Sequence, residues 1–70
     1  MIPLTMAVTG EENSVKKIGG KEETRQFLSR LGIIPGAFIT IITQISGNVI
    51  VSVKESRVAI SREMASKIMV

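Results

Sequence analysis

The stretch Gln26–Ile42 contains an abrupt change of hydrophobic period, and this change is what most constrains the fold. Apolar residues recur at helical spacing up to Leu31 and alternate in a strand pattern from Ala37 onward. Gly32 follows the last helical apolar residue, where a left-handed cap belongs, because glycine reaches positive φ without a Cβ penalty. The stretch therefore predicts a helix that stops at Gly32 and turns into a strand.

The residues between this helix and strand predict how the two elements meet. Ile33 or Ile34 is expected to fold back onto the helix end, as the hydrophobic partner of such a cap usually does. Pro35 and Gly36 suit the central positions of a type II turn, because proline presets φ and glycine takes the positive φ that follows. We therefore assign Gly32, Pro35 and Gly36 a structural role, which is to hold the helix at its angle on the sheet.

The length of 70 residues predicts one domain, residues 1–70, with a small core. The 44% apolar fraction, rich in Ile and Val, favours strands over disorder. The chain has no cysteine and no histidine, which excludes disulfides and the usual zinc and copper ligands. No apolar run approaches the roughly 20 residues that span a bilayer, and Met1–Thr5 does not resemble a signal peptide. We expect a cytoplasmic domain whose net charge of +3 serves solubility.

The helix is predicted to run from about Glu22 to Leu31. Its apolar stripe has Thr24 and Leu31 near the centre and Phe27 and Leu28 at the two edges. So few large apolar residues cannot hold a short helix in isolation. The helix is therefore expected to pack on a sheet.

Short alternating or apolar runs bounded by turn residues predict about five strands. The candidates are Ser14–Ile18, Ala37–Ile45, Val49–Lys54, Arg57–Ile60 and Ile68–Val70. In the longest candidate, Ile39, Ile41 and Ile45 are expected on one face, and the three valines of Val49–Lys54 are expected to point inward. Ser46-Gly47-Asn48 is the expected hairpin turn, and Ser61 is the expected N-cap of a short C-terminal helical turn. The pattern predicts an all-β fold, a small closed or half-closed barrel with one inserted helix.

Nearly the whole chain resembles the ferrous-iron transport protein A family in its order of residues. The resemblance rests on Ile18-Gly19-Gly20, on Leu28-Ser29-Arg30-Leu31-Gly32-Ile33-Ile34-Pro35-Gly36, on Gly47-Asn48-Val49-Ile50-Val51, and on Val58-Ala59-Ile60-Ser61-Arg62. It implies an SH3-like barrel and a cytosolic accessory role beside a ferrous-iron transporter with a GTP-binding domain and a membrane pore. The chain departs from the family at Glu55-Ser56, where members commonly carry glycine, and in its compact Ser46–Asn48 turn. The same barrel also occurs as a domain of iron- and manganese-dependent repressors.

No catalytic constellation is found in the sequence. Without histidine or cysteine the familiar nucleophilic triads cannot form. The pairs Glu11-Glu12 and Glu22-Glu23 consist of adjacent residues, whose side chains point apart. Gly19-Gly20-Lys21 lacks the rest of a phosphate-binding loop. We therefore expect a protein that is not an enzyme and has no cofactor.

The sequence gives little support for binding of a metal ion or of a polyproline peptide. Only carboxylates, carbonyls and four methionines remain as ligands for ferrous iron, and we interpret Met6, Met64 and Met69 as core residues. Phe27 and Phe38 are likewise expected in the core, and without Trp or Tyr an aromatic groove for polyproline peptides cannot form. No metal site is therefore predicted. The arginines are scattered, so nucleic-acid binding stays a minor alternative.

Protein recognition is the function that these exclusions leave. We hypothesise that Arg25, Leu28 and Arg30 form an apolar patch with a basic rim that contacts the cytosolic part of the transporter. The alternative for Leu28 is that it completes the core. Two further alternatives stay open: a detached regulatory barrel of a metal-dependent repressor, and a homodimer formed through exposed Ile and Val side chains.

Overall fold

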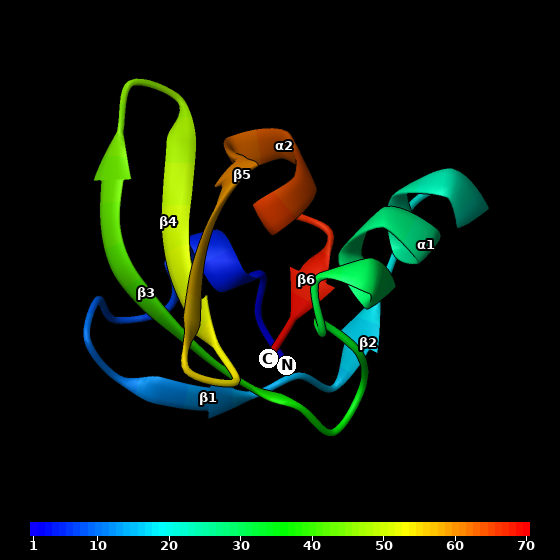
Figure 1. Ribbon diagram of the computed structural model, residues 1–70, viewed down its shortest axis with the longest axis horizontal. Helices are drawn as coiled ribbons and strands as arrows, with labels where there is room; N and C mark the ends of the chain where they lie inside the picture. The colour runs from blue at the N-terminus through cyan, green and yellow to red at the C-terminus, as the bar shows by residue number, and fades with distance from the viewer.

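Strands dominate the computed structural model, which describes residues 1–70 (Figure 1). The elements in chain order are η1 (Leu4–Met6), β1 (Glu12–Ser14), β2 (Lys17–Ile18), α1 (Glu22–Arg30), β3 (Phe38–Ile45), β4 (Asn48–Val53), β5 (Ser56–Ser61), α2 (Arg62–Ala65) and β6 (Ile68–Met69). The predicted helix and the strands of the hairpins are confirmed to within one or two residues at each end. The predicted strand Ser14–Ile18 is instead divided between β1 and β2.

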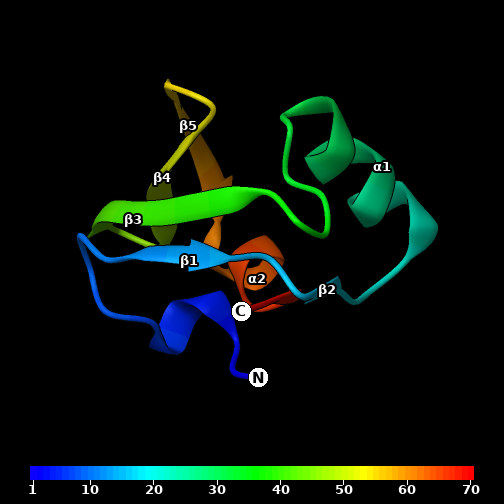
Figure 2. The same ribbon diagram turned by 90° about the horizontal axis from the view of Figure 1, so that it is seen from below.

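The strands form two antiparallel sheets that together make a half-closed barrel. One sheet has four strands in the order β1-β3-β4-β5, and the other pairs β2 with β6. The four-stranded sheet curls around the core, while α1 lies to one side, next to β2 (Figures 1 and 2). The two ends of the chain meet, because Ile2 and Val70 exchange both backbone hydrogen bonds at 2.8 Å. The predicted all-β barrel with one inserted helix is thus confirmed.

The end of α1 has the predicted glycine cap. Gly32 adopts φ +89° and donates its N–H to the carbonyl of Ser29 at 2.9 Å. The N–H of Ile33 bonds to the carbonyl of Leu28, also at 2.9 Å, which completes a Schellman motif. Ile33 is fully buried and is therefore the hydrophobic partner that the sequence predicts.

The turn after the cap also matches the prediction. Ala37 donates its N–H to the carbonyl of Ile34 at 3.0 Å, and Gly36 has φ +92°, as a type II turn requires. Two further bonds of 2.8 Å tie this turn to Val15, from the Gly36 N–H to the Val15 carbonyl and from the Val15 N–H to the Ala37 carbonyl. The segment that leaves the helix is therefore fastened to the chain between β1 and β2.

The core is a single cluster of 13 buried apolar residues. Its members are Leu4, Val15, Ile18, Leu28, Ile33, Ile39, Ile41, Val49, Val51, Val53, Ile60, Ala65 and Ile68. The alternation predicted for β4 is confirmed, because Val49, Val51 and Val53 are at most 2% exposed. The core thus lies between the inner face of the curled sheet, α1 and the C-terminal elements.

A β-bulge in β3 overturns the prediction that Ile45 shares the buried face of Ile39 and Ile41. Ile41 pairs with Val51, but the next pair is Thr43 with Ile50, so the register shifts by one residue at Ile42. Beyond the shift the side chains exchange faces, because side-chain direction alternates along a strand. Ile45 consequently lies opposite Asn48 and is 57% exposed.

The remaining local predictions are confirmed in part. The side-chain oxygen of Ser61 accepts the N–H of Met64 at 3.1 Å, so Ser61 caps α2 as predicted. The β3–β4 turn consists of Ser46 and Gly47 alone, both at positive φ, and Asn48 already belongs to β4. Two such residues at positive φ match the twist of a tight hairpin.

Three side chains expected in the core are instead exposed. Phe27 is 41%, Phe38 60% and Met6 70% exposed. Phe27 lies at the edge of the helical stripe, and Phe38 lies on the outer face of β3, opposite to Ile39. The predictions for these residues are wrong because aromatic and thioether side chains also occur at positions that the backbone turns away from the core.

Candidate functional site

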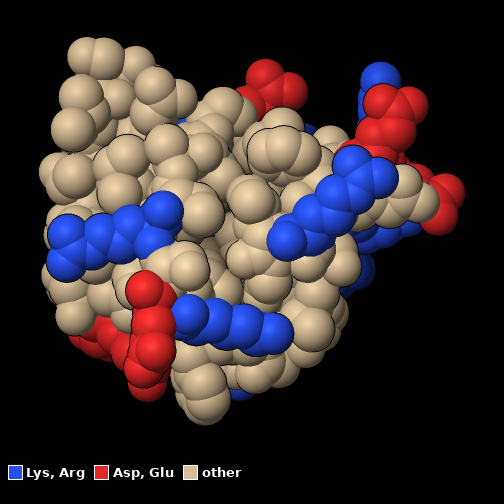
Figure 3. Space-filling view, in the orientation of Figure 1, with Lys and Arg blue, Asp and Glu red and all other residues tan.

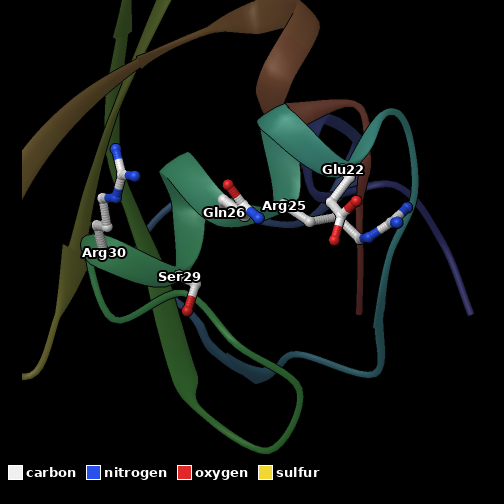
Figure 4. Close-up of a pocket in the computed structure, with 5 residues that line it drawn as sticks. All are labelled: Glu22, Arg25, Gln26, Ser29 and Arg30. Carbon is white, nitrogen blue, oxygen red and sulfur yellow. The ribbon is translucent and has the colours of Figure 1, made fainter.

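The solvent-facing side of α1 is the candidate functional site. Leu28 anchors the helix in the core, and the opposite side of the helix is exposed to solvent. Exposed residues of that side line an open depression of about 550 Å³, and we call them the helix face (Figure 4). The residues are Glu22, Arg25, Gln26, Ser29 and Arg30.

The two arginines of the helix face occupy opposite ends of it. Arg25 donates from Nη1 to the carbonyl of Gly20 at 2.7 Å, which directs its side chain toward the start of the helix. Arg30 lies in the last turn, where a cation complements the helix dipole. Figure 4 shows the two guanidinium groups directed away from one another, with Gln26 and Ser29 between them along the helix. The helix face thus offers two separated cations, a neutral polar centre and the carboxylate of Glu22 to a partner.

The structure corrects the prediction for Leu28. This side chain is 0% exposed, so a partner cannot touch it on the folded domain. The structure agrees with the alternative interpretation, in which Leu28 completes the core. Leu28 therefore leaves the set of candidate contact residues, while Arg25 and Arg30 remain exposed on the helix face.

Gly32, Pro35 and Gly36 lie where the sequence places them, at the cap and the turn that follow the helix. They fix the direction of α1 through backbone conformation and make no surface patch with the arginines. Gly32 also sits beside the β4–β5 hairpin, because a Cβ built on it would lie 3.4 Å from Cδ of Lys54. These residues therefore position the helix face indirectly.

Sequence reasoning missed the polar members of the helix face, Glu22, Gln26 and Ser29. The helical period places all three outside the apolar stripe, and that is the signal that could have identified them.

A second exposed depression, of about 470 Å³, surrounds the outward-facing Phe38 and includes Glu12 and Glu55. It mixes both charge signs and an aromatic ring, so it shows no preference for one class of ligand.

No part of the molecule gathers three or more histidine, cysteine, aspartate or glutamate side chains in a geometry that could hold a metal ion. Charges on the face shown in Figure 3 surround an uncharged centre, with basic side chains on several sides and acidic ones between them. This face therefore carries no continuous basic stripe of the kind that follows a nucleic-acid backbone. None of the helices combines the length and the apolar character that crossing a membrane requires.

Two sequence comparisons point to the same family. The sequence model described as the FeoA domain matches residues 2–70. A protein of Methanocaldococcus jannaschii, named "Putative Fe(2+) transport protein A", is 44% identical over 70 residues, which cover all of this chain and 85% of that protein.

Solved structures share the same fold. A crystal structure of an iron uptake regulatory protein (FeoA) is 34% identical, with a TM-score of 0.87, covering 97% of this chain and 90% of the other. The solution structure of the FeoA protein from Chlorobium tepidum has a TM-score of 0.89 at 18% identity, covering 97% and 67% of the two chains. A manganese-dependent transcriptional repressor has a TM-score of 0.82 at 16% identity, covering 94% and 38%. The last two similarities concern the fold, which is the small SH3-like barrel that the resemblance implied.

Proposed function

The chain belongs to the FeoA domain family, and from that premise we propose that it is a non-enzymatic accessory protein of ferrous-iron uptake. In this proposal it works in the cytoplasm and binds the cytosolic, GTP-binding part of a ferrous-iron transporter. Family membership supports the link to ferrous iron, since the relative from M. jannaschii is named as an Fe(2+) transport protein. The mode of action, contact with another protein, is inferred from the surface of this chain.

One observation carries the proposal: the helix face is an exposed surface on a helix whose Leu28 is buried in the core and whose C-terminal end is fixed by a glycine cap. Leu28 anchors α1 in the core, and the hydrogen bonds that Gly32 and Ile33 donate fix its end. Arg25 is already held in one direction by its bond to Gly20. A surface whose side chains and backbone are ordered before binding loses less conformational entropy when a partner docks. The helix face therefore suits recognition of a folded protein domain.

Binding to a GTP-binding domain can alter nucleotide hydrolysis without any catalytic residue from the accessory protein. A partner that prefers one conformation of that domain shifts its population toward it, by as much as the two affinities differ. Modulation of the transporter then requires only that the helix face bind the two nucleotide states unequally. The protein would thus act by contact alone.

The test is a binding measurement with the purified GTP-binding domain of the ferrous-iron transporter encoded in the same genome. The double variant Arg25→Glu, Arg30→Glu is expected to weaken binding by about tenfold, because two favourable charge contacts become repulsive. The double variant Arg57→Glu, Arg62→Glu makes the same change in net charge elsewhere on the surface and should bind like the wild type. GTP hydrolysis by the domain, measured with and without each protein, separates binding from modulation.

Equal binding by both double variants would remove the helix face from the proposal, and no binding by the wild type would contradict the proposed partner. The second candidate is a detached barrel of a metal-dependent repressor, since a manganese-dependent repressor contains the same fold. At 16% identity that similarity concerns the fold alone. Co-purification with a helix-turn-helix protein rather than with the transporter would favour that candidate.

A further inference from the structure

A groove next to the helix face has a composition that the helix face lacks. It lies between β2, α1 and the segment that joins α1 to β3, which are neighbours in both ribbon views (Figures 1 and 2). Its volume is about 360 Å³, within the range of about 300–1,000 Å³ typical of small ligand sites. We call it the basic groove, and its lining residues are Lys16, Lys17, Ile18, Arg25, Ser29, Ile33, Ile34 and Pro35.

The inner surface of the basic groove is aliphatic. Ile18 and Ile33 belong to the core and are 8% and 0% exposed, so they form a firm floor. Ile34 is 41% exposed and, with the exposed Pro35, forms a wall that stays in contact with water in the free protein. Covering this wall with an aliphatic side chain would remove apolar surface from water, which favours binding.

The rim of the groove carries positive charge only. Lys16, Lys17 and Arg25 line it, and none of its lining residues is acidic. The side-chain hydrogen bond of Arg25 goes to a neutral backbone carbonyl, that of Gly20, so the bond orders the guanidinium without neutralising it. Charge complementarity therefore selects a negatively charged partner.

The combination of floor and rim distinguishes between acidic partners. A nucleic acid would need exposed aromatic rings for its bases to stack on, and no aromatic residue lines the groove. A peptide with an aliphatic residue flanked by carboxylates matches both parts, because the aliphatic side chain covers Ile34 while the carboxylates meet the lysines and Arg25. We propose that the basic groove is a docking site for an acidic peptide segment with an aliphatic anchor residue.

This inference rests on the proposed function and extends it, because such a segment would belong to the same partner that docks on the helix face. Arg25 and Ser29 line both surfaces, so the two form one continuous binding region. A folded domain bound to the helix face could extend an acidic loop or tail into the basic groove. The groove would then add specificity for the charge of the partner.

The experiment is a titration of the ¹⁵N-labelled protein with a synthetic pentapeptide that has a leucine between two pairs of aspartates. The amides of Lys16, Lys17, Ser29 and Ile34 are expected to shift at about 1 mM peptide, a concentration that detects even weak sites. The peptide with serine in place of leucine should bind less tightly, and added salt should weaken binding of both. The absence of shifts in these amides, or shifts confined to other faces, overturns the proposal.

Matched variants test both parts of the groove. Lys16→Glu combined with Lys17→Glu should reduce affinity for the pentapeptide about tenfold, whereas the Arg57→Glu, Arg62→Glu control should not. Ile34→Ser should reduce it several-fold, whereas Ile45→Ser, at an isoleucine that is also exposed but lies on β3, should leave it unchanged. Equal effects of each variant and its control contradict the assignment.

Failure of this inference can be told apart from failure of the proposed function. Peptide binding in the groove together with no capture of the transporter domain supports the groove and contradicts the proposed partner. Capture of the domain by the Lys16→Glu, Lys17→Glu variant at wild-type affinity contradicts the groove and leaves the partner standing. Each result decides one of the two proposals.

Discussion

The backbone N–H of Ile33 reaches back 2.9 Å to the carbonyl of Leu28, and both side chains are fully buried. The hydrogen bond ends the helix and sets the direction of the chain toward β3. The two buried side chains complete the core at that point. The hydrogen bond requires Gly32, between the two, to hold a φ of +89°. The candidate site depends on it, because the helix face and the wall of the basic groove lie on either side of this junction.

Replacing Gly32 or Gly36 by alanine should cost about 1 kcal/mol of unfolding free energy each. Both residues have φ near +90°, where a Cβ is strained. At Gly32 the new methyl group would meet Lys54 at 3.4 Å, and at Gly36 it would meet nothing within 4 Å, so similar losses would identify backbone strain as the cause. Urea denaturation measures the effect, and Gly19→Ala, without a positive φ, should change little. A neutral Gly36→Ala variant would contradict the strain.

Leu28→Ala should destabilise the domain by about 2–5 kcal/mol, because it leaves a cavity in the core. Phe27→Ala should cost only about 1 kcal/mol, since 41% of that side chain is already in water. Denaturation curves of the two variants give the comparison. A Leu28→Ala protein as stable as Phe27→Ala would contradict the burial of Leu28.

Ser61→Ala should remove about 1 kcal/mol of stability, because the N–H of Met64 loses the oxygen that it bonds at 3.1 Å. Ser56, at the other end of β5, is exposed and makes no side-chain hydrogen bond of this kind, so Ser56→Ala is the control and should be neutral. Thermal unfolding followed by circular dichroism measures both. Equal melting temperatures for the two variants would show that the cap contributes nothing.

Glu55→Gly should stabilise the domain by about 0.5 kcal/mol. Glu55 has φ +66° in the tight turn between β4 and β5, where a residue with a Cβ is strained. Glycine removes that strain but adds freedom to the unfolded chain, so the net gain is smaller than the strain itself. A shift of the urea midpoint to higher concentration is expected. A lower midpoint would mean that the Glu55 side chain stabilises the turn by more than its backbone strain costs.

Local signals in the sequence were enough to predict the junction after α1, the inward valines of β4 and the cap at Ser61. Each depends on residues close together in the chain: a glycine after a helical stripe, a strict alternation, a hydroxyl before a helical turn. Such features are retained in the folded protein because few backbone conformations are available to the residues around them. The barrel class followed from their sum and from the resemblance to a family.

Features that depend on the whole fold could not be read in the same way. The bulge at Ile42 inserts one residue into the register, and the doubled isoleucine Ile41-Ile42, which breaks the alternation there, does not by itself show whether a bulge follows. Ile45 was therefore assigned to the wrong face. The orientation of α1 beside the barrel decided that Leu28 is fully buried while Phe27 is 41% exposed.

The basic groove shows the same limit for the candidate site. In the sequence, Lys16 and Lys17 are only members of a short strand candidate, whereas Arg25 is already part of the hypothesised contact patch. Packing of α1 beside β2 brings the three to one opening, above a floor of core residues. The positions of these three residues in the sequence do not show that they lie close together, because the distance between residues of different elements is set by how the elements pack.

The turn Ile34–Ala37 is tied by two backbone bonds of 2.8 Å to Val15, at the junction between β1 and β2. The wall formed by Ile34 and Pro35 therefore cannot swing outward unless the neighbouring strands come apart, which links its opening to unfolding of the domain. Amide protons at Gly36 and Val15 should consequently exchange with solvent about as slowly as those of the barrel itself. An incoming segment would meet a preformed surface. Nearly all of the conformational entropy lost on binding would therefore be lost by that segment.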